Sequence, residues 1–132
     1  MLYITALTAA ALSILCVMLA FKVIGIRRRD KISVGDGGSD ELLRAIRAQA
    51  NLLEYAPLTL ILFACAEFNG VHWTILMILA VAFIVGRLLH PVGIKDAGAP
   101  GKARVVGMIL TLNVMLALCV VNIVWVVWTL AT

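Results

Sequence analysis

The chain has 132 residues, of which 64% are hydrophobic and only 14% are charged. An average soluble domain is about half apolar and about a quarter charged, so this composition excludes an ordinary soluble globular protein. The net charge of +4 comes without a basic patch that is interleaved with aromatic residues, and we therefore expect no nucleic-acid partner.

The first predicted element is a membrane-spanning helix over about residues 2–26. Residues 2–21 carry no charge, and about 20 apolar residues in a helix suffice to cross the hydrocarbon core of a bilayer. Arg27, Arg28 and Arg29 follow this run as a stop-transfer flank, and no basic residue precedes it. This order differs from that of a cleavable signal peptide.

The second predicted helix, over residues 40–68, joins a polar first half to an apolar second half. Ser39 and Asp40 favour an N-cap at its start, and Gly70 favours a stop just beyond its end. The apolar half alone is too short to span a membrane. We therefore expect both halves to form one helix.

Two further helices are predicted, over residues 71–90 and 104–130. Pro91 should stop the first of them, because proline lacks a backbone donor. The expected fold is an all-α integral membrane protein, a bundle of four transmembrane helices that forms one domain over residues 1–132. Its three loops should lie near residues 27–39, 69–72 and 92–103.

The cations predict the orientation of the chain. All eleven lie toward the membrane face that the first and third loops share, and the opposite face has none: Lys22, Arg27, Arg28, Arg29, Lys31, Arg44, Arg47, Arg87, Lys95, Lys102 and Arg104. The positive-inside rule places these two loops in the cytoplasm and both termini on the opposite side. In a bacterium the membrane would be the cytoplasmic membrane.

A polar stripe marks the candidate site. Arg47, Asn51 and Glu54 are spaced i, i+4 and i+7, so they share one face of the second helix. Such groups are costly at membrane depth and usually face a bundle interior or a polar cavity. The alternative is a purely structural polar lock between helices.

The cysteines and histidines predict no further chemistry. Cys16, Cys65 and Cys119 are isolated within apolar spans and are interpreted as small core residues. The lack of a Cys-x-x-Cys pair argues against a membrane thiol oxidoreductase. His72 and His90 are far apart in the sequence, and we expect no metal site.

Other polar and small residues have structural interpretations. Glu67 is expected to be an interfacial carboxylate, and Asn113 and Asn122 are expected to make hydrogen bonds between helices. Two pairs of small residues, spaced four apart, predict close helix contacts: Ala82 with Gly86, and Gly107 with Thr111. Trp73, Trp125 and Trp128 are expected to form an aromatic belt on the outer side.

Residues 47–57, RAQANLLEYAP, resemble the second-helix signature of the membrane-associated proteins in eicosanoid and glutathione metabolism (MAPEG). Residues 86–90, GRLLH, resemble the end of the family's third helix. The length, the four spans and the basic first loop also match. This resemblance implies a homotrimer of four-helix subunits. It also implies glutathione as co-substrate, bound at three sites between neighbouring subunits near the cytoplasmic face.

Carried over residue by residue, the resemblance implies that Arg47, Asn51, Glu54 and Tyr55 bind glutathione. Gln49 corresponds to a position that can reach the site from the neighbouring subunit. Glutathione carries two carboxylates and one ammonium, and an arginine can bind a carboxylate through two parallel hydrogen bonds. Glu54 can accept from the ammonium or hold Arg47 in place, while Asn51 can serve peptide groups.

The remaining site residues also come from the resemblance. Arg27 or Arg28 corresponds to an arginine from the adjacent subunit, and Arg104 corresponds to the catalytic arginine beside the sulfur. A fixed positive charge there favours the thiolate and lowers the thiol pKa from about 8.5 toward neutrality. His90 has a parallel in the prostaglandin synthase branch. Ile94 stands where the mammalian enzymes tend to have tyrosine, and it cannot donate a hydrogen bond.

The expected function is that of a glutathione-dependent membrane enzyme, a transferase and/or peroxidase that acts on lipophilic electrophiles or hydroperoxides. One alternative is a glutathione-binding relative without transferase activity. Another is a small four-helix multidrug exporter. The exporters are similar only in length and span number, and their essential glutamate lies in the first helix, where residues 2–21 contain no acid.

Overall fold

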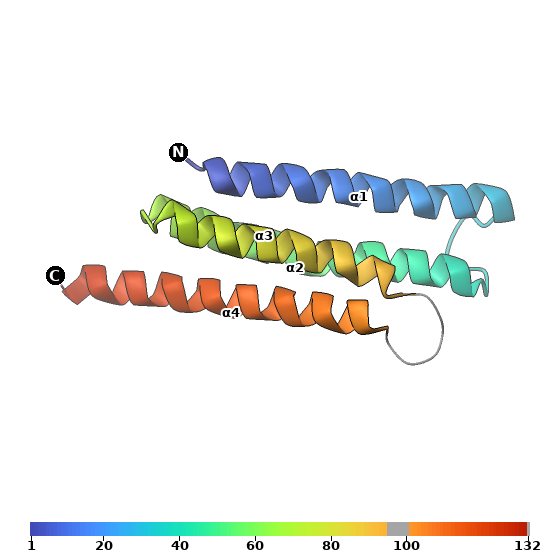
Figure 1. Ribbon diagram of the computed structural model, residues 1–132. Coiled ribbons are helices and arrows are strands. Elements are labelled where there is room, and N and C mark those ends of the chain that lie inside the picture. The colour runs from blue at the N-terminus through green and yellow to red at the C-terminus, as the bar shows by residue number, and fades with distance from the viewer. Residues whose placement is uncertain (95–100, 132) are drawn as a thin grey trace.

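The computed structural model describes residues 1–94 and 101–131 as four helices that run alternately up and down beside one another (Figure 1). They are α1 (Tyr3–Asp30), α2 (Asp40–Phe68), α3 (Trp73–Val92) and α4 (Lys102–Ala131). All four are long and apolar enough to cross a membrane, as the sequence predicts. Lys95 and the middle of the expected third loop lie outside the described residues.

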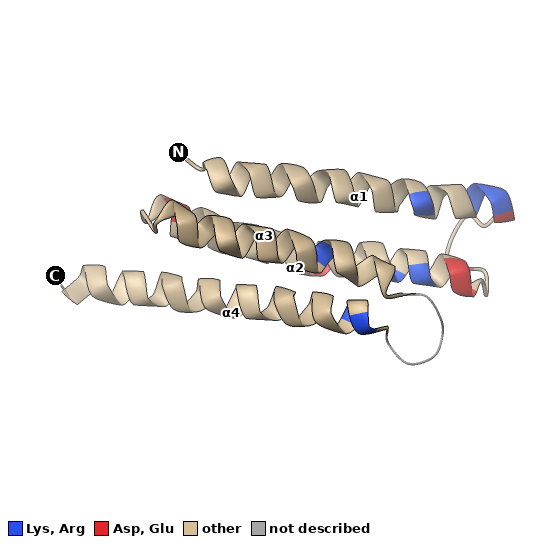
Figure 2. Cartoon of the chain, in the orientation of Figure 1, with Lys and Arg blue, Asp and Glu red and all other residues tan. Residues whose placement is uncertain are grey.

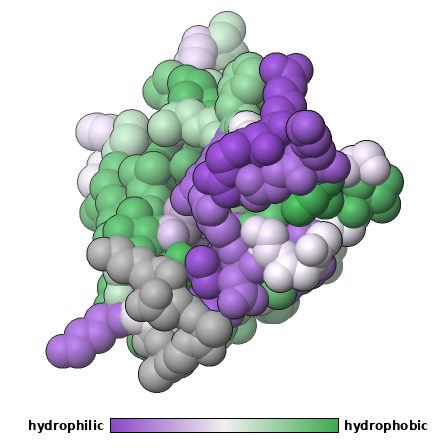
Figure 3. Space-filling model, turned by 90° about the vertical axis from the view of Figure 1, so that its right-hand side faces the viewer, coloured by the Kyte–Doolittle hydropathy of each residue, from purple (hydrophilic) through white to green (hydrophobic). Residues whose placement is uncertain are grey.

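The two ends of the bundle differ in charge. The described lysines and arginines gather toward the end away from the termini (Figure 2), and Figure 3, which looks at this end, shows hydrophilic residues beside a hydrophobic surface. At the other end, the Glu67 carboxylate accepts hydrogen bonds from the backbone N–H groups of Ile4 and Thr5, each at 2.8 Å. Glu67 therefore caps the N-terminus of α1, which otherwise has unsatisfied donors.

The first helix is longer than predicted. It continues to Asp30 instead of ending at residue 26, so the three arginines belong to its last turn and not to a loop. Cations are favourable at a helix C-terminus because the helix dipole is negative there. Lys31, in the left-handed region at φ 55°, ends the helix. Arg29 then contacts Asp30 and Glu41 at 2.7 Å each, which ties the end of α1 to the start of α2.

The bounds of α3 and α4 also differ from the prediction. Pro91 does not stop α3, which continues to Val92, because a proline in the last turn removes only one hydrogen bond. The helix begins at Trp73, where the His72 side chain accepts from the backbone N–H of Thr74 at 3.3 Å. Helix α4 begins at Lys102, two residues before the predicted start.

Three interpretations of single residues can be checked against the bundle. The Asn122 side chain donates to the Leu62 carbonyl of α2 at 3.1 Å, so the predicted contact between helices is confirmed. The prediction for Asn113 is wrong, since its exposed side chain donates within α4 to Ile109 at 2.8 Å. The interpretation of Cys65 as a core residue is wrong, because its side chain lies on the outward face of α2 and is exposed.

Helices α3 and α4 approach each other closely at Gly86 and Gly107. A Cβ atom placed on Gly107 would lie 2.6 Å from the Gly86 carbonyl oxygen and 3.0 Å from the His90 backbone nitrogen. Both neighbours are backbone atoms that cannot turn away. The predicted close contact is therefore confirmed at these two glycines, and it brings the helix backbones together beside the candidate site.

Gly107→Ala is expected to lower stability by about 1–3 kcal/mol, because an added methyl group in a tight contact forces the backbones apart. The matched control is Gly25→Ala in α1, where a Cβ meets nothing within 4 Å. That control should leave the melting temperature in detergent unchanged or slightly higher, since alanine favours helix. Equal melting temperatures for the two variants would contradict the close contact.

Candidate functional site

A buried arginine lies where α2, α3 and α4 meet. Arg87 is only 2% exposed. It lies in the half of α3 toward the basic end of the bundle, where the sequence analysis placed it, but inside the bundle and not on its surface. Acceptors from α2 and α4 bind its two terminal nitrogens, whereas its buried Nε has no partner among the described residues.

The contacts of Arg87 are with neutral groups. One terminal nitrogen, Nη1, donates to the Asn51 side-chain oxygen at 2.8 Å, and the other, Nη2, donates to the Thr111 hydroxyl and to the Gly107 carbonyl. The guanidinium also lies over the Tyr55 ring, 5.5 Å from its centre. Within residues 1–94 and 101–131, no carboxylate pairs with Arg87. The cation is thus held by dipoles and a ring face.

The polar stripe divides between the inside and the outside of the bundle. Asn51 is buried against Arg87, whereas Arg47 and Glu54 pair with each other at 3.8 Å with side chains 60% and 49% exposed. The stripe was expected to face a bundle interior or a polar cavity, and within the described protomer only Asn51 faces the interior. Asn51 faces a different direction because it lies about 40–60° around the helix axis from Arg47 and Glu54.

Glu54 lies at the middle of α2, fourteen residues from each end of the helix. At a rise of about 1.5 Å per residue, the carboxylate is about 21 Å from either end. The hydrocarbon core is about 30 Å thick, so a centrally placed α2 puts Glu54 at membrane depth. The Arg47–Glu54 pair is thus an outward-facing ion pair on a membrane-spanning helix.

Gln49 and Tyr55 lie on different sides of α2. Tyr55 turns inward against Arg87. Gln49, two residues after Arg47, is about 200° around the helix from it and is half-buried. Gln49 therefore points away from the Arg47–Glu54 pair of its own chain.

Arg87, His90 and Arg104 form a basic cluster that extends from α3 to α4. His90, one turn after Arg87, is buried and lies within electrostatic reach of both Arg87 and Arg104. Arg104 is exposed at the start of α4 and borders an open hollow of about 510 Å³ on the outer face of that helix. Ile94 packs against the apolar core and offers no donor.

Arg27 and Arg28 both border an open hollow of about 370 Å³ at the end of α1. Arg28 is exposed, while Arg27 is partly buried and its Nη1 has no partner among the described residues. The choice between them that the sequence left open stays open.

The candidate residues thus form two sets. The inward set, held together by the bundle, is Asn51, Tyr55, Arg87 and His90. The outward set lies on the surface of one protomer and comprises Arg47, Gln49, Glu54, Arg28 and Arg104. Arg87 is the residue that the sequence analysis missed as a site member. The sequence did contain an indication of this role, because Arg87 is the only charged residue between positions 71 and 94.

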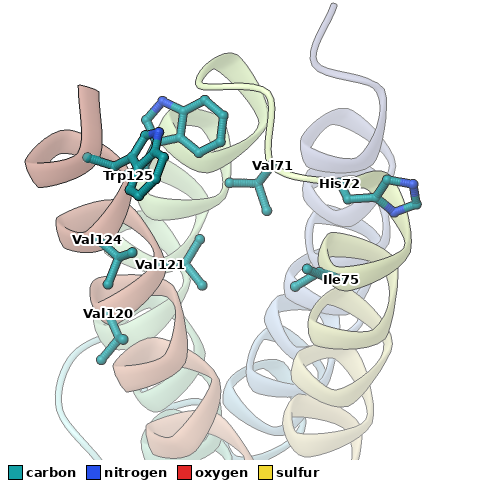
Figure 4. Close-up of a pocket in the computed structure, with 8 residues that line it drawn as sticks. Val71, His72, Ile75, Val120, Val121, Val124 and Trp125 are labelled. Carbon is teal, nitrogen blue, oxygen red and sulfur yellow. The ribbon is translucent and has the colours of Figure 1, made fainter. Parts of the chain in front are cut away.

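The opposite end of the bundle holds an apolar hollow of about 460 Å³ between α3 and α4 (Figure 4). Valine, isoleucine and tryptophan side chains line most of it, and His72 is its one titratable lining residue. The exposed Trp73 and Trp125 lie at this end, as expected for an aromatic belt. No charged residue borders the hollow, so the polar chemistry of the described chain gathers at the basic end.

Fold and site together define a four-helix membrane protein with a basic cluster between its last three helices. The sequence model of the MAPEG family matches residues 5–124, and the chain belongs to this family. It is 33% identical over 90 residues to the inner membrane protein YecN of Escherichia coli K12, a match that covers 68% of this chain and 69% of the relative. The YecN protein of E. coli O6:H1 matches equally well. The chain is therefore a multi-pass membrane protein of a glutathione-related family.

Proposed function

We propose that the protein is a homotrimeric, glutathione-dependent membrane enzyme that joins glutathione to lipophilic electrophiles or reduces lipophilic hydroperoxides. Glutathione would bind between neighbouring protomers near the basic end of the bundle. The basic first and third loops would face the cytoplasm, with both termini on the opposite side. Membership of the MAPEG family supports the proposal at the level of a membrane protein related to glutathione metabolism.

The observation that carries the proposal is the outward-facing Arg47–Glu54 pair, whose side chains are about half exposed. Lipid cannot solvate a carboxylate at membrane depth, so ionised groups in spans face protein or a polar cavity. Residues 1–94 and 101–131 of its own protomer leave about half of each side chain uncovered. A second protomer, with a polar ligand held between the two, supplies that cover.

The outward set has the chemistry that glutathione needs. Arg47 offers a fork of donors for a carboxylate, and Glu54 offers an acceptor for the ammonium group. Gln49 points away from Arg47 of its own chain, which suits a residue that serves the neighbouring site. Arg28, exposed at the end of α1, is available to the same interface.

In the proposed reaction Arg104 stabilises the glutathione thiolate. The sulfur attacks the electrophilic carbon, an S–C bond forms, and the leaving group departs with its electron pair. Arg104 is exposed at the basic end of the bundle, within electrostatic reach of the buried His90, and its guanidinium brings positive charge to the region where the sulfur would lie. Ile94 is packed into the apolar core and takes no part.

The oligomeric state is the first test. Native mass measurement in a mild detergent is expected to give three chains per particle, and glutathione should raise the melting temperature of that particle. A monomer, or a dimer with antiparallel subunits, would contradict the proposed interface. A trimer that binds glutathione but gives no thioether product with a model electrophile would favour the binding-only alternative.

A further inference from the structure

The orientation of the Asn51 amide is determined by its neighbour. The two ends of an asparagine amide are hard to tell apart by shape alone. A guanidinium, however, has five N–H donors and no acceptor. The Asn51 atom that lies 2.8 Å from Arg87 Nη1 must therefore be the oxygen, and the amide NH₂ group must point the other way.

This NH₂ group has no acceptor in the part of the chain that the structure describes. Asn51 as a whole is only 9% exposed, but its NH₂ nitrogen is not among the fully buried side-chain atoms without a partner. The donor therefore reaches the surface of the protomer, where a ligand can accept from it. The unpaired donor also lies on the stripe between Arg47 and Glu54, one turn from each along α2.

We propose that Arg87 is a positioning residue that holds the Asn51 amide with its oxygen inward, so that Asn51 presents only N–H donors to the bound ligand. Asn51 then selects a carbonyl or carboxylate oxygen of the ligand and rejects an N–H group at that point. With glutathione as the ligand, which rests on the proposed function, the partner is a peptide carbonyl or a carboxylate oxygen.

The position of Arg87 suits this role. Its side chain is fixed on the far side by the Thr111 hydroxyl and the Gly107 carbonyl of α4, and the Tyr55 ring covers its face at 5.5 Å. The guanidinium therefore cannot follow Asn51 if the amide turns. A rotated amide would place two donors against a cation, which removes a hydrogen bond and adds repulsion.

The substitution Asn51→Asp removes the N–H donor of residue 51 but keeps its contact with Arg87 of α3. Aspartate also accepts from Arg87, so the link between α2 and α3 remains, but the NH₂ group is lost. The melting temperature of the trimer should stay equal to that of the wild type or rise. The Kd for glutathione, measured by calorimetry, should increase by about tenfold or more. A Kd within twofold of the wild type would overturn the proposal.

Variants of Arg87 test the positioning. Arg87→Met frees the Asn51 amide and should weaken glutathione binding by about tenfold, while Arg87→Lys restores one donor and should recover part of this loss. Thr8→Val is the matched control, because it removes a buried hydroxyl whose hydrogen bond stays within α1, to the Ile4 carbonyl. It should bind within twofold of the wild type. Equal loss in Thr8→Val and Arg87→Met would reduce Arg87 to a packing role and overturn the proposal.

A readout without glutathione keeps this inference separate from the proposed function. Nitrogen-15 spectra of asparagine-labelled protein identify the Asn51 amide as the pair of signals that Asn51→Asp lacks. The wild type should show one sharp pair, and Arg87→Met should shift or split it. Unchanged signals in Arg87→Met would contradict the positioning role. If the wild type shows the sharp pair but binds no glutathione, only the proposed function fails.

Discussion

Arg47→Ala is expected to remove most of the protection that glutathione gives the protein against heat. The variant loses the donor fork for a carboxylate and leaves Glu54 without its partner, 3.8 Å away in the wild type. In a trimer that covers the pair, an unpaired buried charge costs about 3–5 kcal/mol. This corresponds to a loss of affinity of about two to four powers of ten.

The same substitution also reports on the interface. In an isolated protomer the pair is half exposed, and such a pair would contribute about 0–1 kcal/mol in water. The melting temperature should be recorded over a series of glutathione concentrations. Arg44→Ala, one turn earlier on α2, is the matched control and should keep the wild-type protection. Equal protection of wild type and Arg47→Ala would place the glutathione site elsewhere.

Arg104→Ala is expected to lower turnover with a soluble model electrophile by about a hundredfold, the size of effect seen when one stabilising group is removed from developing or fixed negative charge. The Kd for glutathione should change only a few-fold. The thiolate absorbance of the bound complex, titrated against pH, should give a higher apparent pKa in the variant. The lost interaction favours the charged form of the sulfur, so its loss favours the thiol.

Two comparisons sharpen this result. Lys102→Ala removes an exposed cation two residues earlier and should leave both turnover and the thiol pKa unchanged. His90→Phe removes the buried imidazole that interacts electrostatically with Arg87 and Arg104 and tests how much His90 contributes to turnover. If Arg104→Ala keeps full activity while Arg27→Ala or Arg28→Ala abolishes it, the thiolate partner lies on α1 of the neighbouring subunit.

The existence of the four helices could be predicted because membrane spans depend mainly on local composition. A run of about 20 apolar residues is sufficient in the bilayer, where backbone groups must bond within the helix. The ends of the helices were less predictable. The last turn of α1 depends on the helix dipole and on the contact of Arg29 with Glu41 of the next helix. Proline at position 91 did not end α3, since it lies in the last turn.

The residues of the candidate site were likewise predictable only in part. The spacing of Arg47, Asn51 and Glu54 and the family resemblance follow from the sequence alone, because helical periodicity sets which residues share a face. The tertiary structure decided that Asn51 turns inward while the Arg47–Glu54 pair turns outward. It also decided that Arg87 is buried, since the close approach of α3 and α4 supplies the acceptors Gly107 and Thr111 and α2 supplies Asn51. Burial and hydrogen-bond partners depend on residues far apart in the chain, and spacing along one helix does not contain them.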